Sequence, residues 1–129
     1  MNKTEFVSEI KPILKKLDYK KNNTYWYKYH EDYIECICVC GSQWDMNDYF
    51  IEVGYSTFEN GKYPTLLNWY CRYMLEGQSG QYNISPIEFF NGTQSFFDSI
   101  SSKKDIDCFI KNSTAIKVGN QFIITTMNN

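Results

Sequence analysis

Four short stretches of the chain alternate between aromatic or branched apolar side chains and other residues. They are residues 25–30, 33–40, 49–55 and 69–74. Alternation with a period of two is typical of strands in a half-buried antiparallel sheet. The polar residues 30–32 predict a tight hairpin between the first two strands. We therefore expect a four-stranded antiparallel meander.

A helix is expected before the first strand. In residues 3–17 the apolar side chains recur at helical spacing, with lysines on the opposite face. Those apolar residues are Phe6, Ile10, Ile13, Leu14 and Leu17. Pro12 lies inside this segment and removes one backbone hydrogen bond, so we expect a kink or a late start of the helix.

The pattern becomes helical again after residue 80. Ser85 and Pro86 are suited to the N-cap and first positions of a helix, and Gly92 is expected to interrupt the apolar segment that follows. Gly119 and Asn120 separate two β-rich arms and predict a terminal hairpin. The sequence thus predicts one α+β domain over residues 1–129: an N-terminal helix, a four-stranded antiparallel meander sheet, C-terminal helices and a terminal β-hairpin.

Charge and hydropathy exclude several classes of protein. The formal net charge is −2, from 13 basic and 15 acidic residues, so no general field attracts nucleic acid or an anionic membrane. No apolar stretch approaches the roughly 20 residues of a membrane-spanning helix. The first residues lack the apolar core of a secretory signal, and we expect a cytoplasmic protein with reduced thiols.

Three cysteines, Cys36, Cys38 and Cys40, alternate along the second predicted strand. Their positions along a strand are roughly 6.5 to 7 Å apart, which is too long for disulfides between them. The run also lacks the turn that wraps a zinc ion, so we expect small buried side chains beneath a helix. A metal site would require Cys71 or Cys108 on the same face; we expect no metal and no cofactor.

Catalytic chemistry has few candidates. His30 is the one histidine, and a pairing with Cys71 as nucleophile would be needed for a cysteine–histidine hydrolase. Glu35 and Glu52 lie on neighbouring predicted strands, but their faces depend on strand register. No phosphate-binding loop or hydrolase motif is present. We therefore predict that the protein is not an enzyme.

The first predicted strand offers two faces for binding. Trp26, Lys28 and His30 share one face, and three tyrosines share the other. Whichever face is less buried carries aromatic rings into solvent, which favours a binding surface. Trp44, in the loop after the second strand, is a further candidate anchor for a partner.

Arg72 lies in the middle of a predicted strand, with Tyr70 on the same face. The favoured interpretation is an ion pair with Glu35 or Glu52 across strands. The alternative is that Arg72 anchors an anionic ligand group or a carboxylate of a partner.

The order of motifs resembles a known family. The matching residues are an opening helix over residues 6–17, Tyr19-Lys-Lys, Tyr25-Trp-Tyr27, Ser42-Gln-Trp44 and Tyr49-x-Ile-x-Val-Gly54. Over roughly residues 4 to 75 the chain resembles the bacterial domain-of-unknown-function family 4304. The cysteine run departs from the family pattern. The resemblance implies an α+β domain and a bacterial cytosolic protein, and it carries over no catalytic residues.

A small, slightly acidic, aromatic-rich chain without catalytic motifs suits an inhibitor that presents a rigid surface. We predict a non-catalytic bacterial protein-interaction domain, and specifically an immunity protein that binds and neutralises a toxin. The candidate partner-binding residues are Trp26, Lys28, His30, Trp44, Tyr70 and Arg72.

Two other functions stay open. One is a small-ligand-binding or enzymatic α+β domain with a pocket between the sheet and the C-terminal helices, near Arg72, Tyr70 and Glu52. The other is a structural homodimer that pairs through an exposed sheet edge or face.

Overall fold

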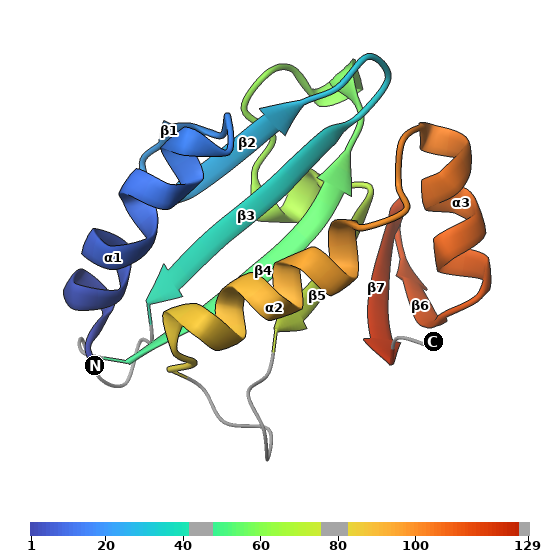
Figure 1. Ribbon diagram of the computed structural model, residues 1–129. Helices are drawn as coiled ribbons and strands as arrows, with labels where there is room; N and C mark the ends of the chain where they lie inside the picture. The colour runs from blue at the N-terminus through green and yellow to red at the C-terminus, as the bar shows by residue number, and fades with distance from the viewer. Residues whose placement is uncertain (42–47, 76–82, 127–129) are drawn as a thin grey trace.

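The computed structural model describes residues 1–41, 48–75 and 83–126 of the 129-residue chain. In these ranges the chain forms three α-helices, seven β-strands and two short 3-10 turns (Figure 1). They are α1 (Lys3–Lys16), β1 (Lys20–Asn22), β2 (Tyr25–Tyr29), β3 (Ile34–Gly41), β4 (Tyr49–Ser56), η1 (Phe58–Asn60), η2 (Leu66–Asn68), β5 (Cys71–Leu75), α2 (Pro86–Phe97), α3 (Lys103–Lys111), β6 (Thr114–Val118) and β7 (Gln121–Thr126).

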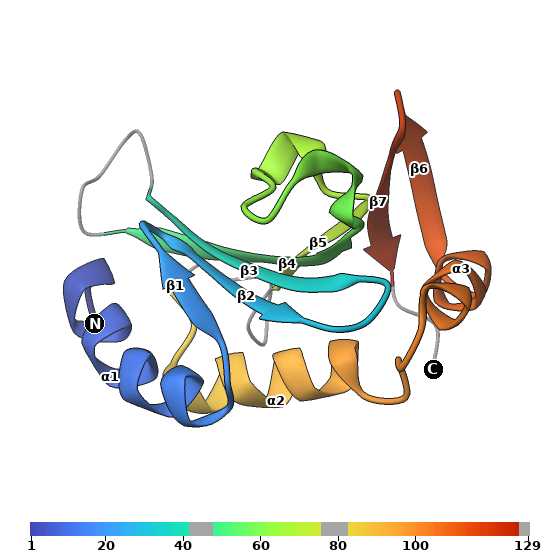
Figure 2. The same cartoon turned by 90° about the horizontal axis from the view of Figure 1, so that it is seen from above.

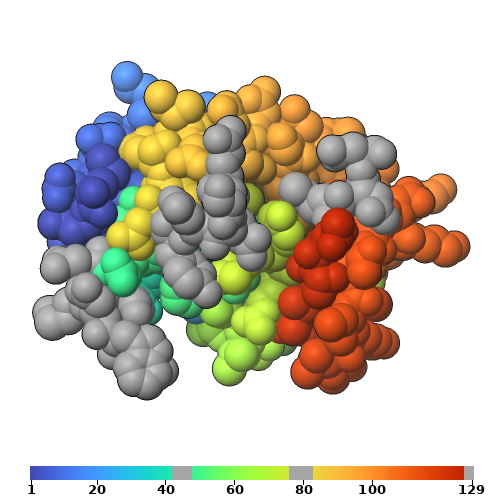
Figure 3. All heavy atoms as spheres, turned by 90° about the horizontal axis from the view of Figure 1, so that it is seen from below, coloured from blue at the N-terminus to red at the C-terminus, as the bar shows by residue number. Residues whose placement is uncertain are grey.

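The seven strands form one mixed sheet in the order β1-β2-β3-β4-β5-β7-β6. The meander β2–β5 is antiparallel, whereas β5 and β7 pair in parallel. The expected α+β class is confirmed, but a four-stranded antiparallel sheet understates the structure. The sheet is larger because β1 pairs with β2 and the C-terminal hairpin pairs with β5. In Figure 3 the red atoms of β7 lie beside the yellow-green atoms of β5.

Helix α1 begins earlier than the proline suggested. The Asn2 side chain accepts from the backbone N–H of Glu5, and the Glu5 carboxylate accepts from the Asn2 backbone, which is a capping box. The helix continues through Pro12 to Lys16. The expected late start is therefore wrong, because the capping box starts the helix well before the proline.

Helix α2 begins at the predicted cap. Ser85 accepts from the N–H of Glu88 and Pro86 occupies the first turn. The helix passes through Gly92 without the expected interruption. A Cβ at Gly92 would lie 3.0 Å from the Leu75 side chain, so the glycine allows α2 to lie close to the end of β5.

The two faces of the sheet are covered differently. Figure 2 shows α1 and α2 beneath one face and the connection between β4 and β5, residues 57–70, above the other. We call these the helix face and the connection face. The helix face holds the main core, which includes Phe6, Ile37, Val53 and Phe96, all 0% exposed. Helix α3 lies beside β6 at the far end of the sheet (Figure 2).

The cysteine strand lies on the connection face. Cys36 and Cys38 are buried together with Trp69 in a second core cluster. The covering element is the connection between β4 and β5, so the expectation of a covering helix is wrong. The Tyr27 hydroxyl on β2 donates to the carbonyl of Pro64 over 2.8 Å, which fixes the connection against the sheet.

Gly54 permits this close packing. A Cβ at position 54 would lie 2.1 Å from the carbonyl oxygen of Cys71 and 2.8 Å from the Trp69 ring.

No helix in the described part of the chain has the length and apolarity to cross a membrane.

Candidate functional site

A large hollow lies on the connection face, between residues 57–70 and the β6–β7 hairpin. Its volume is about 720 Å³. We call it the Arg72 cleft, because Arg72 lines it from the start of β5. The other charged side chains that line it are Lys117 on β6 and Glu59 on η1. With two cations and one carboxylate, the cleft favours a negatively charged group.

Strand register explains where Arg72 points. Arg72 is the Cα partner of Gly54, which in turn is the partner of Cys36. Side chains in register share a face of the sheet, so Arg72 lies on the connection face. Glu35 is in register with Tyr55 and belongs to the helix face. The expected Arg72–Glu35 pair is therefore wrong.

Glu52 lies on the same face of the sheet as Arg72, but the two residues are not directly opposite each other on β4 and β5. Its Cα partner on β5 is Met74. Burial raises the pKa of Glu52, and the positive charge of Arg72 acts in the opposite direction. Among the described residues, no carboxylate lies within ion-pair distance of Arg72. The expected Arg72–Glu52 ion pair is thus also wrong, and one Glu52 carboxylate oxygen is buried without a hydrogen-bond partner in the described structure.

Tyr70 forms part of the cleft wall. Its hydroxyl donates to Asp107 on α3 over 2.6 Å, and this hydrogen bond raises the pKa of Tyr70 to about 12. The ammonium of Lys103 lies over the ring, 5.0 Å from its centroid. The polar end of Tyr70 is therefore directed toward α3, and its ring is the part that borders the cleft.

Exposed apolar side chains surround the cleft and the adjoining surface. Leu67 on η2 is 77% exposed and Val118 on β6 is 57% exposed, and both line the cleft. Phe58 and Tyr63, in the same connection, are 43% and 57% exposed. A cationic cleft with apolar borders is the arrangement found at the centre of many protein interfaces.

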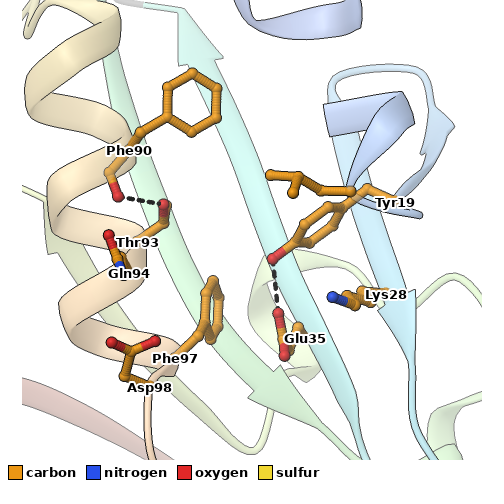
Figure 4. Close-up of a pocket in the computed structure, with 9 residues that line it drawn as sticks. Tyr19, Lys28, Glu35, Phe90, Thr93, Gln94, Phe97 and Asp98 are labelled. Carbon is orange, nitrogen blue, oxygen red and sulfur yellow. Dashed lines mark hydrogen bonds between the residues drawn. The ribbon is translucent and has the colours of Figure 1, made fainter. Parts of the chain in front are cut away.

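A second hollow lies on the helix face, between β2–β3 and α2 (Figure 4). Its volume is about 460 Å³. We call it the Glu35 pocket. Glu35 is 6% exposed; one of its carboxylate oxygens accepts from the Tyr19 hydroxyl over 2.6 Å, and the other lies 2.8 Å from His30 Nε2. Burial, and then the Glu35 charge, raise the pKa of Tyr19.

Two aromatic walls and one cation complete the Glu35 pocket. Phe90 and Phe97 line it from α2. The ammonium of Lys28 lies 5.6 Å from the centroid of the Tyr19 ring. His30 is held in place by the ring of Tyr33, which stacks on it at 4.3 Å between centroids. The pocket is polar at its floor and aromatic at its sides.

The predicted binding residues are divided between these places. Tyr70 and Arg72 line the cleft, Lys28 lines the Glu35 pocket, and His30 lies within hydrogen-bond distance of Glu35. Trp26 is 1% exposed in the main core. The expectation that it offers a contact surface therefore fails, because α1 covers its face of the sheet (Figure 2). Trp44 lies outside the described residues. Sequence reasoning missed Tyr19 and Lys117.

The candidates for metal and thiol chemistry are also placed. No group of three histidine, cysteine or acidic residues in the described ranges is arranged to hold a metal ion. Cys71 is buried in the main core, and burial raises its pKa to about 12. A thiol with such a pKa is protonated near neutral pH and is a poor nucleophile.

Comparison with known proteins gives one result. No curated protein and no solved structure matches the chain. Residues 10–70 match the family described as Domain of unknown function (DUF4304). The matched range extends from α1 to the residue before β5, so it contains Tyr19, Lys28 and Glu35 of the Glu35 pocket and one wall of the Arg72 cleft. The resemblance to this family is thus confirmed over residues 10–70.

Proposed function

We propose that the chain is a non-catalytic protein-interaction domain that binds its partner at the Arg72 cleft. The observation that carries this proposal is the guanidinium of Arg72, which has no ion-pair partner among the described residues and lines a cleft with apolar borders. An arginine held by a strand loses little additional freedom on binding and can form two parallel hydrogen bonds with one carboxylate. Such arginines are common among the residues that dominate binding energy.

The neighbouring side chains define the partner's chemistry. Lys117 adds a second positive charge, while Leu67 and Val118 offer apolar contacts that exclude water around the charge pair. The fitting partner presents an acidic side chain between apolar ones. Exclusion of water strengthens the charge pair and adds specificity, since a partner without the carboxylate leaves Arg72 desolvated and unpaired.

Within this class we propose an immunity protein that neutralises a toxin by binding it. Two features support the role: a slightly acidic chain of 129 residues, and exposed aromatic side chains at Phe58 and Tyr63 beside the cleft. An inhibitor of this kind needs a rigid surface with aromatic and charged anchors rather than reactive groups.

The test is an affinity purification of the tagged protein from cells that naturally produce it, read by mass spectrometry against an untagged lysate. The proposal predicts one stoichiometric protein partner, and a toxin-like nuclease or peptidase would support the immunity role. The absence of any specific partner in cells that express the protein would contradict the proposal.

A second candidate function rests on the Glu35 pocket. A buried carboxylate with two hydrogen-bonding neighbours at the floor of an aromatic pocket is suited to a small polar ligand. The test is a thermal-shift screen of small polar compounds against the wild type and Glu35→Gln. A ligand that raises Tm of the wild type and not of the variant would support this function; no such ligand would favour the interaction domain.

A further inference from the structure

Two cysteine sulfurs lie close together on the connection face, in a place that the proposed function does not use. Cys38 and Cys40 are alternate residues of β3, and their Sγ atoms lie 3.4 Å apart. The backbone spacing of roughly 6.5 to 7 Å between these positions was expected to prevent a disulfide, but the two side chains lean toward each other and close about half of that distance. Cys36 has the same spacing from Cys38, yet its Sγ contacts the carbonyl of Ile34 instead.

The two thiols differ in exposure and in chemistry. Cys38 is 4% exposed and Cys40 is half-buried, and all five cysteines of the chain are free. The hydrogen bond between the two sulfurs lowers the pKa of Cys38, and Thr24 acts in the same direction, whereas burial and the negative charge of Glu52 act against them. Cys38 is therefore the more readily deprotonated member, and Cys40 is the thiol beside it.

The neighbouring strand adds a further polar group. Glu52 is the Cα partner of Cys38 and lies on the same face of the sheet. Its buried oxygen without a hydrogen-bond partner, noted above, leaves this part of the connection face polar but incompletely satisfied.

We propose that Cys38 and Cys40 are an oxidation site that a small peroxide converts reversibly into an intrastrand disulfide. The Cys38 thiolate attacks one oxygen of hydrogen peroxide; an S–O bond forms, the O–O bond breaks, and hydroxide leaves. The Cys40 thiol then attacks the Cys38 sulfenic acid, the S–S bond forms, and water leaves with the Cys40 proton. The two sulfurs are oxidised by two electrons in total and one peroxide is reduced. A thiolate with an adjacent resolving cysteine is the usual arrangement for such a step.

The geometry predicts that this disulfide is easily reduced. A disulfide requires sulfurs about 2.05 Å apart, and alternate strand positions, at roughly 6.5 to 7 Å, lie at the upper limit of the spacing that disulfides span. Closing the gap from 3.4 Å therefore strains β3 locally. Strained disulfides have more oxidising potentials and belong to the labile class.

The test uses the reduced full-length protein and one equivalent of hydrogen peroxide. The remaining thiols are alkylated with N-ethylmaleimide after unfolding, and the mass is measured. We expect the number of alkylated thiols to fall from five to three and to return to five after dithiothreitol. Trypsin should place the bond within residues 29–62, which contain Cys36, Cys38 and Cys40.

Two variants of matched chemistry assign the bond. Cys36→Ser should still lose two alkylated thiols after peroxide, whereas Cys40→Ser should form no disulfide and should instead give a Cys38 sulfenic acid that reacts with dimedone. Five alkylated thiols after peroxide treatment of the wild type would overturn the proposal. A bond that persists in Cys40→Ser, or disappears in Cys36→Ser, would also overturn it, because the bond would then join other cysteines.

Discussion

The substitution Gly54→Ala tests how the connection face is built. The added Cβ would lie 2.1 Å from the carbonyl oxygen of Cys71, and real Cβ atoms essentially never approach closer than 3.0 Å, so one of the two strands must shift by about 0.9 Å. The obstructing atom belongs to the backbone, and the Trp69 ring lies 2.8 Å away on the same side. Neither can yield by a simple rotation of a flexible side chain.

The cost follows from these contacts. Overpacking of a well-packed site costs typically 1–3 kcal/mol, and a displaced backbone hydrogen bond adds roughly 1 kcal/mol. We therefore expect Gly54→Ala to lower the free energy of unfolding by about 3 kcal/mol. At this chain length the loss corresponds to a fall in Tm on the order of 10 °C.

Urea unfolding, followed by circular dichroism, measures this change, and Gly41→Ala is the matched control. A Cβ at Gly41 would meet only the flexible end of Lys3, at 3.5 Å. The control should stay within about 0.5 kcal/mol of the wild type. If Gly54→Ala unfolds at the same urea concentration as Gly41→Ala, Trp69 and β5 do not pack on β4 as described.

Two further predictions concern buried carboxylates. Glu52→Gln should raise Tm at pH 8 and have less effect at pH 4. Burial raises the pKa of Glu52 in the folded state. The stability linked to the protonated carboxyl is therefore present below the pKa of the unfolded chain and is lost as pH rises through the pKa of the folded protein. A lower Tm of Glu52→Gln at pH 8 would show that attraction to Arg72 exceeds the burial cost. Tyr19→Phe should reduce the free energy of unfolding by about 1–3 kcal/mol in urea, because it removes the 2.6 Å hydrogen bond to buried Glu35. An unchanged unfolding midpoint would contradict that role for Tyr19.

The alternation of side chains and the turn residues correctly predicted the strands and the hairpin that depend on neighbouring residues. The alternating residues form the meander β2–β5, and Gly119, at φ +60°, lies in the turn of the terminal hairpin. Strand β1 was missed because its residues, Lys20–Asn22, are polar and become a strand only by pairing with β2. The parallel pairing of β5 with β7 joins segments about 50 residues apart. No local periodicity encodes such a contact.

The same limit applied to the candidate sites. The hairpin register, in which Lys28 opposes Glu35, could have indicated that His30 lies near Glu35. Tyr19 could not be placed, because its position depends on β1. Lys117 reaches the Arg72 cleft only through the β5–β7 pairing. Arg72 itself was singled out correctly as a residue of interest, but its expected ion pairs required a register that strand patterns alone do not fix.

The central claim is that Arg72 anchors a protein partner. The most direct measurement compares three tagged baits in parallel purifications from the native cells: the wild type, Arg72→Met, and Lys104→Met, which removes the same charge from an exposed position of α3 outside the residues lining the cleft. Thermal unfolding of each bait first establishes that all three are folded. The account predicts one shared partner for the wild type and Lys104→Met, and a loss of at least about 10-fold in the amount bound to Arg72→Met. Equal recovery of that partner with Arg72→Met would contradict the account.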